Sequence, residues 1–254
     1  MVKFFTVVCW IVFVGMIPVQ KKITIFSIGD STMCYYGPEK LNTGYGKAGY
    51  PVSGWMMPAG DFFNKNVTIT NVARSGRSSK SFRAEGCWDT VIKTIRPGDY
   101  VFIQFGHNDS KPDTSRFTDP NTTFHDNLLR YINETKQKGG KPVLFTSIAR
   151  RAFDSTGVLL DTHGDYITAV RKLATETNTP LIDLNKKTIK LLTELGPEES
   201  KKLFCYLEPG ELPGYPNGAR DDTHLNSNGA QKVCALAIEG IKELHLPLEK
   251  YLKK

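Results

Sequence analysis

The sequence predicts an α/β fold of three layers, α/β/α, in which a doubly wound, five-stranded parallel sheet lies between two layers of helices. Five short segments are rich in the β-branched and aromatic residues that favour β-strands. The longer segments between them carry apolar residues at helical spacing. Strands that alternate with helices pair in parallel through crossover connections, so this order favours one sheet that is covered on both faces.

The elements are expected in a regular order along the chain. In one helical segment Phe124, Leu128 and Ile132 recur at helical spacing, and Gly139-Gly140 ends the pattern. Pro180 opens the last strand. The expected strands are Ile23–Ile28, Val67–Val72, Tyr100–Gln104, Val143–Thr146 and Leu181–Asp183, and the expected helices are Cys87–Ile95, Thr122–Lys138, Asp165–Thr177, Leu184–Leu195 and Ser227–Leu244.

Composition is that of a folded protein with one domain. The chain has 254 residues, of which 40% are hydrophobic and 23% charged, enough for one sizeable α/β core. No repeat or linker divides it, so residues 21–254 are expected to form a single domain. The net charge of +7 comes from scattered basic residues, which suit an acidic substrate. Nucleic-acid binding is not expected, because no module of basic and aromatic residues is present.

Residues 1–20 have the pattern of a secretory signal peptide. Lys3 precedes an apolar run from Phe4 to Ile17, shorter than the roughly 20 residues of a membrane span. We therefore expect export to the periplasm or the cell exterior without stable membrane insertion. An uncleaved anchor is the alternative, since no clean cleavage site follows the run.

The cysteines that follow this segment do not indicate a metal or redox site. Cys34, Cys87, Cys205 and Cys234 have spacings that fit neither a zinc site nor a redox motif. Buried thiols are the default interpretation, and disulfide pairing remains open.

Three loops after predicted strands carry residues suited to catalysis, since open α/β sheets bind ligands beyond the carboxyl ends of their strands. The first, Gly29-Asp30-Ser31-Thr32, places a serine hydroxyl at the sheet edge, although the same tripeptide also makes ordinary turns. In the second, Gly76 lets the backbone approach a ligand closely, or makes a flexible turn. In the third, Gly106-His107-Asn108-Asp109, the asparagine amide can donate to an oxyanion or form an Asx-turn.

A fourth segment, Asp221-Asp222-Thr223-His224, precedes the last helix and is expected to be a loop. His224 can accept the proton of a serine hydroxyl. Asp221, three residues earlier, can orient the imidazole and stabilise its charged form. A lone histidine is more often structural, but its combination with the three other loops favours a serine hydrolase.

These residues resemble the sequence blocks of a known superfamily. In order, Gly29-Asp30-Ser31, Gly76, Gly106-His107-Asn108-Asp109 and Asp221-x-x-His224 are similar to the four blocks of the SGNH (GDSL) hydrolases, across Ile23 to Leu244. The resemblance implies a flavodoxin-like SGNH fold that needs no metal or organic cofactor. It also implies a nucleophile, Ser31, a base, His224, and its partner Asp221, with an oxyanion hole formed by the N–H groups of Ser31 and Gly76 and the amide of Asn108.

Four further stretches, 76–82, 146–151, 161–166 and 206–215, look like rhamnogalacturonan acetylesterases, which remove acetyl groups from galacturonate residues of pectin. This resemblance implies an acetylated acidic polysaccharide as substrate. The arginine fork matches a carboxylate, and the alternative for each arginine is a structural salt bridge. The expected substrate-binding residues are Arg74, Arg77, His107, Arg150, Arg151, His163 and Tyr215.

Two other functions stay open. An SGNH lipase or acyl-thioesterase would need an apolar groove for a long acyl chain, whereas the loops after the strands are rich in Arg, Ser and Gly. A non-catalytic carbohydrate-binding protein on the same scaffold would not need the set Ser31, Asp221 and His224. We expect a monomeric carbohydrate acetylesterase.

Overall fold

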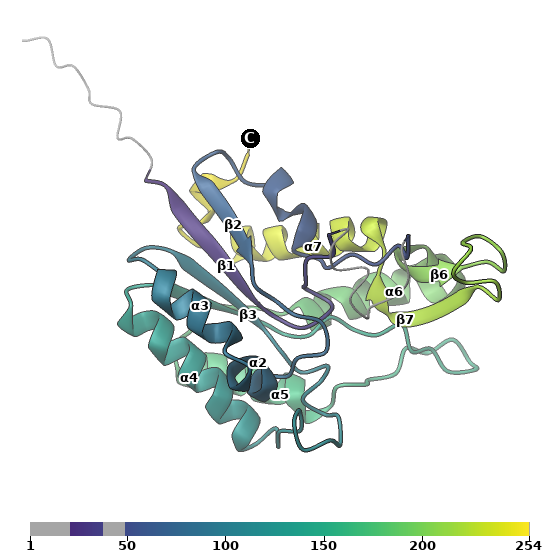
Figure 1. The fold of residues 1–254 in the computed structure, drawn as a ribbon, viewed down its shortest axis with the longest axis horizontal. Helices are drawn as coiled ribbons and strands as arrows, with labels where there is room; N and C mark the ends of the chain where they lie inside the picture. The colour runs from purple at the N-terminus through teal and green to yellow at the C-terminus, as the bar shows by residue number, and fades with distance from the viewer. Residues whose placement is uncertain (1–20, 38–48, 254) are drawn as a thin grey trace, which may run out of the picture.

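The sheet of the protein has the predicted strands and the predicted direction. The structure, a computed structural model, describes residues 21–37 and 49–253, and the expected signal peptide lies outside this part. Five parallel strands lie in the order β2-β1-β3-β4-β5, of which β2, β1 and β3 are labelled in Figure 1. This order is that of a flavodoxin-like sheet. The strands are β1 (Ile23–Gly29), β2 (Val67–Asn71), β3 (Tyr100–Gln104), β4 (Lys141–Phe145) and β5 (Leu181–Ile182).

Helices cover both faces of this sheet, which confirms the three-layer prediction (Figure 1). One layer contains α2 (Ser79–Ala84), α3 (Cys87–Thr94), α4 (Thr123–Gln137) and α5 (Asp165–Glu176). The other contains α6 (Leu184–Glu199), α7 (Ser227–Glu243) and the short 3₁₀ helix η1 (Met57–Asp61). Two more 3₁₀ helices, η2 (Ser200–Leu203) and η3 (Glu249–Tyr251), follow α6 and α7.

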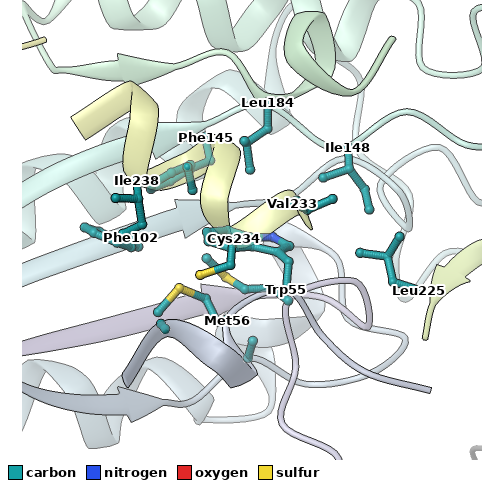
Figure 2. Packing of buried hydrophobic residues seen from close by; sticks show 14 of the residues in the cluster. Trp55, Met56, Phe102, Phe145, Ile148, Leu184, Leu225, Val233, Cys234 and Ile238 are labelled. Atoms are coloured by element: carbon teal, nitrogen blue, oxygen red, sulfur yellow. The ribbon is translucent and has the colours of Figure 1, made fainter. Parts of the chain in front are cut away.

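Each strand supplies both cores because successive side chains of a strand point to opposite faces. In β3, Val101 and Ile103 pack among the residues of α2 to α5. Phe102, between them, packs on the other face with Trp55 and Cys234 (Figure 2). Burying each large apolar side chain stabilises the fold by about 1.5–3 kcal/mol, so the two cores hold the strand ends, and the loops after them, in fixed positions.

Side chains at the helix ends determine where several helices begin. Ser78 and Ser81 form a reciprocal capping box at the start of α2. Asp183 accepts from the N–H of Lys186 at the start of α6, and Asn226 accepts from that of Gly229 at the start of α7. A Cβ at Gly229 would lie 2.0 Å from the carbonyl oxygen of Leu203, so α7 packs closely only because this residue is glycine.

The structure corrects some boundaries and one larger prediction. Strand β4 begins at Lys141 rather than Val143, and α6 continues past Leu195 to Glu199 across a kink at Gly196. The expected loop 221–224 is instead part of a strand: β6 (Phe204–Leu207) and β7 (Ala219–Leu225) form an antiparallel hairpin. The alternating pattern that marks a strand is absent there, because a bulge interrupts β7.

Two other expectations concern the core and the membrane. Cys34, Cys87, Cys205 and Cys234 are all buried, and no disulfide joins any two of them. Among residues 21–37 and 49–253, no helix is long and apolar enough to span a bilayer.

Candidate active site

Ser31 lies on a tight turn directly after β1. The carboxylate of Asp30 accepts hydrogen bonds from the backbone N–H and the hydroxyl of Thr32, at 2.9 and 2.8 Å. The Thr32 hydroxyl accepts from the side-chain amide of Gln104 in β3, whose carbonyl oxygen in turn accepts from the indole of Trp55. The hydroxyl of Tyr36 donates to the carbonyl oxygen of Ser31 at 2.9 Å. The serine is therefore held by a buried network that reaches across two strands.

The hydroxyl of Ser31 contacts a histidine and an aspartate from the hairpin. His224 Nε2 lies 2.9 Å from Ser31 Oγ, and His224 Nδ1 lies 2.8 Å from Asp221 Oδ2. Asp221 Oδ1 accepts from the backbone N–H groups of Thr223 and His224, both at 2.9 Å. The hydroxyl of Tyr50 donates to Asp221 Oδ2 at 3.3 Å. Asp221 is thus held by its own turn and by Tyr50 while it contacts the imidazole of His224.

Hydrogen bonds keep Asp221 ionised. Burial raises the pKa of this carboxyl, but the hydrogen bonds and charge of His224, with the N–H of Thr223, lower it more, and the net pKa lies below its ordinary value. An ionised carboxylate can hold the Nδ1 proton of the imidazole and leaves Nε2 free to accept a proton from Ser31.

A bulge in β7 brings these two side chains together. Cys205 pairs with Asp221, and its neighbour Phe204 pairs with Leu225, so residues 222–224 of β7 have no partner in β6. The extra residues bend the strand and turn His224 back onto Asp221. In a regular strand, residues three apart point to opposite faces, so this contact depends on the bulge.

The three residues of the predicted oxyanion hole, Ser31, Gly76 and Asn108, line one pocket of about 500 Å³ together with His224. The backbone N–H groups of Ser31 and Gly76 donate to no protein group in the described part of the chain. Gly76 has a φ of +79°, a conformation that favours glycine. The amide of Asn108 donates one hydrogen to the carbonyl oxygen of Arg77 at 3.1 Å, which leaves its second hydrogen for a ligand.

Two buried carboxyls lie beneath these loops. Asp109 Oδ1 accepts from the N–H and hydroxyl of Ser79 and the hydroxyl of Thr118, which ties the third loop to the start of α2. Burial raises the pKa of Asp109 to about 7 and that of Asp30 to about 6, against the hydrogen bonds that each accepts. Both carboxyls therefore hold a proton at mildly acidic pH.

The expected substrate-binding residues do not all reach the pocket. His107 and Arg150 line it, together with Lys111, Arg116 and Thr223. His163 lies behind His107, with its Nε2 3.0 Å from His107 Nδ1.

The remaining four lie elsewhere. Arg77 pairs with Glu85 on the surface, and Arg151 is buried between Asp222 and the hydroxyl of Tyr206. These two arginines make the structural salt bridges that the sequence left as an alternative. Tyr215 stacks on Tyr50, with ring centroids 5.0 Å apart, and neither it nor Arg74 lines the pocket.

Several residues of the site carry no signal in the sequence. Tyr50, Gln104 and Lys111 reach the site through tertiary contacts, and none belongs to a recognisable motif. Gln104 is the last residue of β3, but its contact with Thr32 has no signal in the sequence. Tyr50 and Lys111 lie outside the strands, so strand ends do not reveal them.

Comparison with known proteins places this site in a family. The GDSL-like lipase/acylhydrolase family matches residues 27–232. The rhamnogalacturonan acetylesterase RhgT of Bacillus subtilis (strain 168) is 41% identical over 92% of this chain and 95% of its own. The probable rhamnogalacturonan acetylesterase YesY of the same organism is 37% identical over 91% of this chain and 97% of its own.

Solved structures have the same fold. The crystal structure of YxiM from Bacillus subtilis, 28% identical, superposes with a TM-score of 0.73 and covers 91% of this chain, which spans 58% of that longer chain. The acetylxylan esterase Axe2 of Geobacillus stearothermophilus has a TM-score of 0.61 at 17% identity, over 88% of this chain and 95% of its own, a likeness of fold alone. From its matched length, its relatives and its fold, this chain belongs to the GDSL-like lipase/acylhydrolase family.

Proposed function

We propose that this protein is a serine esterase that removes acetyl groups from rhamnogalacturonan, with Ser31, His224 and Asp221 as its catalytic residues. The observation that carries this proposal is the continuous contact from Ser31 Oγ to His224 Nε2 and from His224 Nδ1 to Asp221, at 2.9 and 2.8 Å. The substrate is argued from the two relatives named for rhamnogalacturonan, which match nearly their whole length.

The reaction has two acyl-transfer steps. Ser31 Oγ attacks the acetyl carbonyl carbon while His224 Nε2 takes its proton, and Asp221 stabilises the imidazolium. The oxyanion accepts hydrogen bonds from the N–H groups of Ser31 and Gly76 and from the amide of Asn108. The sugar oxygen leaves with the proton from His224. Water, deprotonated by His224, then attacks the acetyl-serine and releases acetate.

The charge of the pocket supports an acidic glycan. Among the described residues, its lining contains Lys111, Arg116 and Arg150 and no aspartate or glutamate. Arg116 pairs with Asp113, whereas within residues 21–37 and 49–253 Arg150 donates only to neutral acceptors, the carbonyl oxygen of His107 and the oxygens of Thr162. Burial lowers the pKa of Arg150 below its ordinary value, yet a guanidinium stays charged at neutral pH. A carboxylate is the ligand that best pairs with this partly buried guanidinium, and galacturonate supplies one.

The same lining distinguishes the acetylesterase from a lipase or thioesterase. Apart from Pro112 and Gly76, every residue that lines the pocket has a polar side chain, an unfavourable surface for a long acyl chain. The rates of hydrolysis of p-nitrophenyl acetate and p-nitrophenyl octanoate distinguish the two functions. A preference for octanoate would exclude the acetylesterase.

Acetate release from purified polysaccharides tests the substrate. Wild-type protein is assayed on acetylated rhamnogalacturonan, homogalacturonan and xylan, with Ser31→Ala as the control. Fastest release from rhamnogalacturonan, absent in Ser31→Ala, is expected. Fastest release from xylan would refute the substrate, and release by Ser31→Ala would refute the nucleophile. If the wild type and Ser31→Ala bind pectin equally well and the wild type releases no acetate, the protein is a carbohydrate-binding protein and not an esterase.

We also propose that the chain is exported and loses residues 1–20, because a pectic polymer lies outside the cell that degrades it. The apolar run after Lys3 supports export. Sequencing the N-terminus of the mature protein from the culture medium tests this. A mature protein that begins at Met1 would contradict it.

A further inference from the structure

His107 and His163 form a pair of buried imidazoles beside the pocket, and the reaction proposed above does not use them. His107 follows β3, and His163 precedes α5. His163 Nε2 lies 3.0 Å from His107 Nδ1, and the two rings are nearly perpendicular, at 75°. Only 3% of His107 and 6% of His163 are exposed to solvent. Such a pair is a fixed polar element, so its protonation decides what it offers to a ligand.

Both rings are neutral at the pH at which an esterase works. Burial, with the nearby charge of Arg150, lowers the pKa of His163 to about 4. Burial and the neighbouring His163 lower the pKa of His107 well below its ordinary value. Each neutral imidazole carries a single N–H, so one proton lies between the two rings, and its position fixes the tautomer of both.

The surrounding hydrogen bonds favour one position for the proton between the two rings. Arg150 is a donor only, and its Nη1 lies 3.3 Å from the hydroxyl oxygen of Thr162. That hydroxyl keeps its own hydrogen, which can be donated to His163 Nδ1 at 3.4 Å. His163 then carries its proton on Nε2 and donates it to His107 Nδ1. Each group in this chain donates to the next, an order in which hydrogen bonds strengthen one another.

The chain ends on an atom that has no partner. His107 Nε2 is buried and has no hydrogen bond within the described part of the protein. A buried polar group without a partner is costly, and in native proteins such a group calls for a specific explanation. His107 lines the pocket that contains Ser31 and His224, whereas His163 does not. Since no described protein group partners this atom and His107 borders the pocket, we assign a ligand bound there as the partner of His107 Nε2.

We propose that His107 donates its Nε2–H to an oxygen of the sugar that carries the acetyl ester. Arg150, Thr162 and His163 are positioning residues that hold His107 in the required tautomer. The pair thus selects esters of hydroxyl-bearing sugars over simple acyl esters. This inference rests on the proposed acetylesterase function for the identity of the sugar, but not for the tautomer.

Selectivity between two substrates tests the donor. On acetylated rhamnogalacturonan oligosaccharides, His107→Phe is expected to lose about tenfold in kcat/KM, the effect of one hydrogen bond. On p-nitrophenyl acetate, which has no sugar oxygen, the loss is expected to stay below about threefold. His107→Gln restores most of the lost rate, because its amide N–H lies near the position of Nε2. Equal losses on both substrates, or none on either, would overturn the proposal.

The matched control is His125→Gln in α4, whose ring pairs with Glu176 on the surface. It is expected to change neither rate. Unfolding of each variant in urea is measured alongside, so that a loss of folded protein is not read as a loss of selectivity.

NMR of the histidine ring nitrogens tests the tautomer directly. The chain has only 5 histidines, so the long-range ¹H–¹⁵N spectrum is simple. In wild type, His107 is expected to be protonated at Nε2 and bare at Nδ1 between pH 6 and 8. His163→Phe removes the donor and gives a mixture of tautomers, whereas His163→Gln, which keeps an N–H there, does not.

Substrate selectivity and the NMR spectrum together distinguish a failure of this inference from a failure of the proposed function. Protonation of wild-type His107 at Nδ1 refutes the inference whatever the substrate. A wild type that releases acetate from no sugar ester refutes the proposed function, and the spectrum still decides the tautomer.

Discussion

The adjacent residues Asp221 and Asp222 provide a sharp test of the catalytic assignment, because only the first contacts His224. Asp221 Oδ1 accepts two backbone N–H groups, and Oδ2 faces His224 Nδ1 at 2.8 Å. Asp222 turns away and pairs with Arg151 and Tyr206. Substituting each by asparagine keeps the size of the side chain and removes one charge.

The loss expected in Asp221→Asn follows from its hydrogen bonds. The asparagine carbonyl oxygen must stay at the position of Oδ1, since the two backbone donors require an acceptor. The amide N–H then faces Nδ1 and forces the imidazole proton onto Nε2, where it points at Ser31. His224 can no longer accept the serine proton. In serine hydrolases this exchange lowers kcat about 10⁴-fold, which we expect here.

Asp222→Asn is expected to keep its activity within about threefold. It still offers an oxygen to Arg151 and Tyr206, but the buried guanidinium loses a charge partner, at a cost of about 1–3 kcal/mol in unfolding free energy. Steady-state hydrolysis of p-nitrophenyl acetate and unfolding in urea measure the two effects. A kcat of Asp221→Asn above a tenth of the wild-type value, or an equal loss of activity in both variants, would refute the assignment of Asp221.

Three further predictions concern the oxyanion hole, the buried acids and the packing behind the serine. Asn108→Ala is expected to lower kcat about 10²–10³-fold on p-nitrophenyl acetate, because it removes one oxyanion donor; an unchanged kcat would exclude that role. The folded-state pKa of Asp109, about 7, is above the ordinary 3.8, so the stability that this group contributes is full below pH 3.8 and lost as the pH rises through 7. The buried histidines change the stability in the opposite sense, so the wild type is compared with Asp109→Asn at each pH. The difference in unfolding free energy between the two proteins, measured in urea, should fall by about 4 kcal/mol from pH 4 to pH 8. A difference that stays constant with pH would contradict the raised pKa of Asp109. Gly54→Ala should destabilise the fold by about 3 kcal/mol or more, because its Cβ would lie 2.0 Å from a backbone carbonyl oxygen. Gly60→Ala, whose Cβ meets nothing within 4 Å, is the control, and equal melting temperatures of the two variants would refute the packing argument.

Local pattern was sufficient for the sheet and most helices. The strand Tyr100–Gln104 is predicted with the bounds that the structure has, because a short run of mainly β-branched and aromatic residues is typical of a buried parallel strand. Helix α2 and the hairpin of β6 and β7 were not predicted. The first is one and a half turns held by a capping box, and the second is interrupted by a bulge, so neither has enough regular residues to show a period.

The substrate-binding residues show the limit of local reasoning. Arg150 and Arg151 are neighbours in the sequence and chemically identical. The first faces the pocket without a carboxylate partner in the described part of the chain, and the second is buried against Asp222. Successive side chains of an extended backbone point to opposite sides, so Arg150 and Arg151 point in different directions. Which of the two arginines faces the pocket depends on the position of the hairpin formed by β6 and β7.

Residues close together along the chain were enough to predict the fold class, the family resemblance, the loops that carry Ser31, Gly76 and Asn108, and the segment that carries His224, although not that this segment is a strand. How these segments meet depends on contacts that form in the folded protein. The bulge that turns His224 onto Asp221, the contact of His163 with His107 and the pairing of Arg151 join residues far apart in the sequence or bent out of register. Contacts of this kind arise from packing of the whole core, which no local pattern encodes.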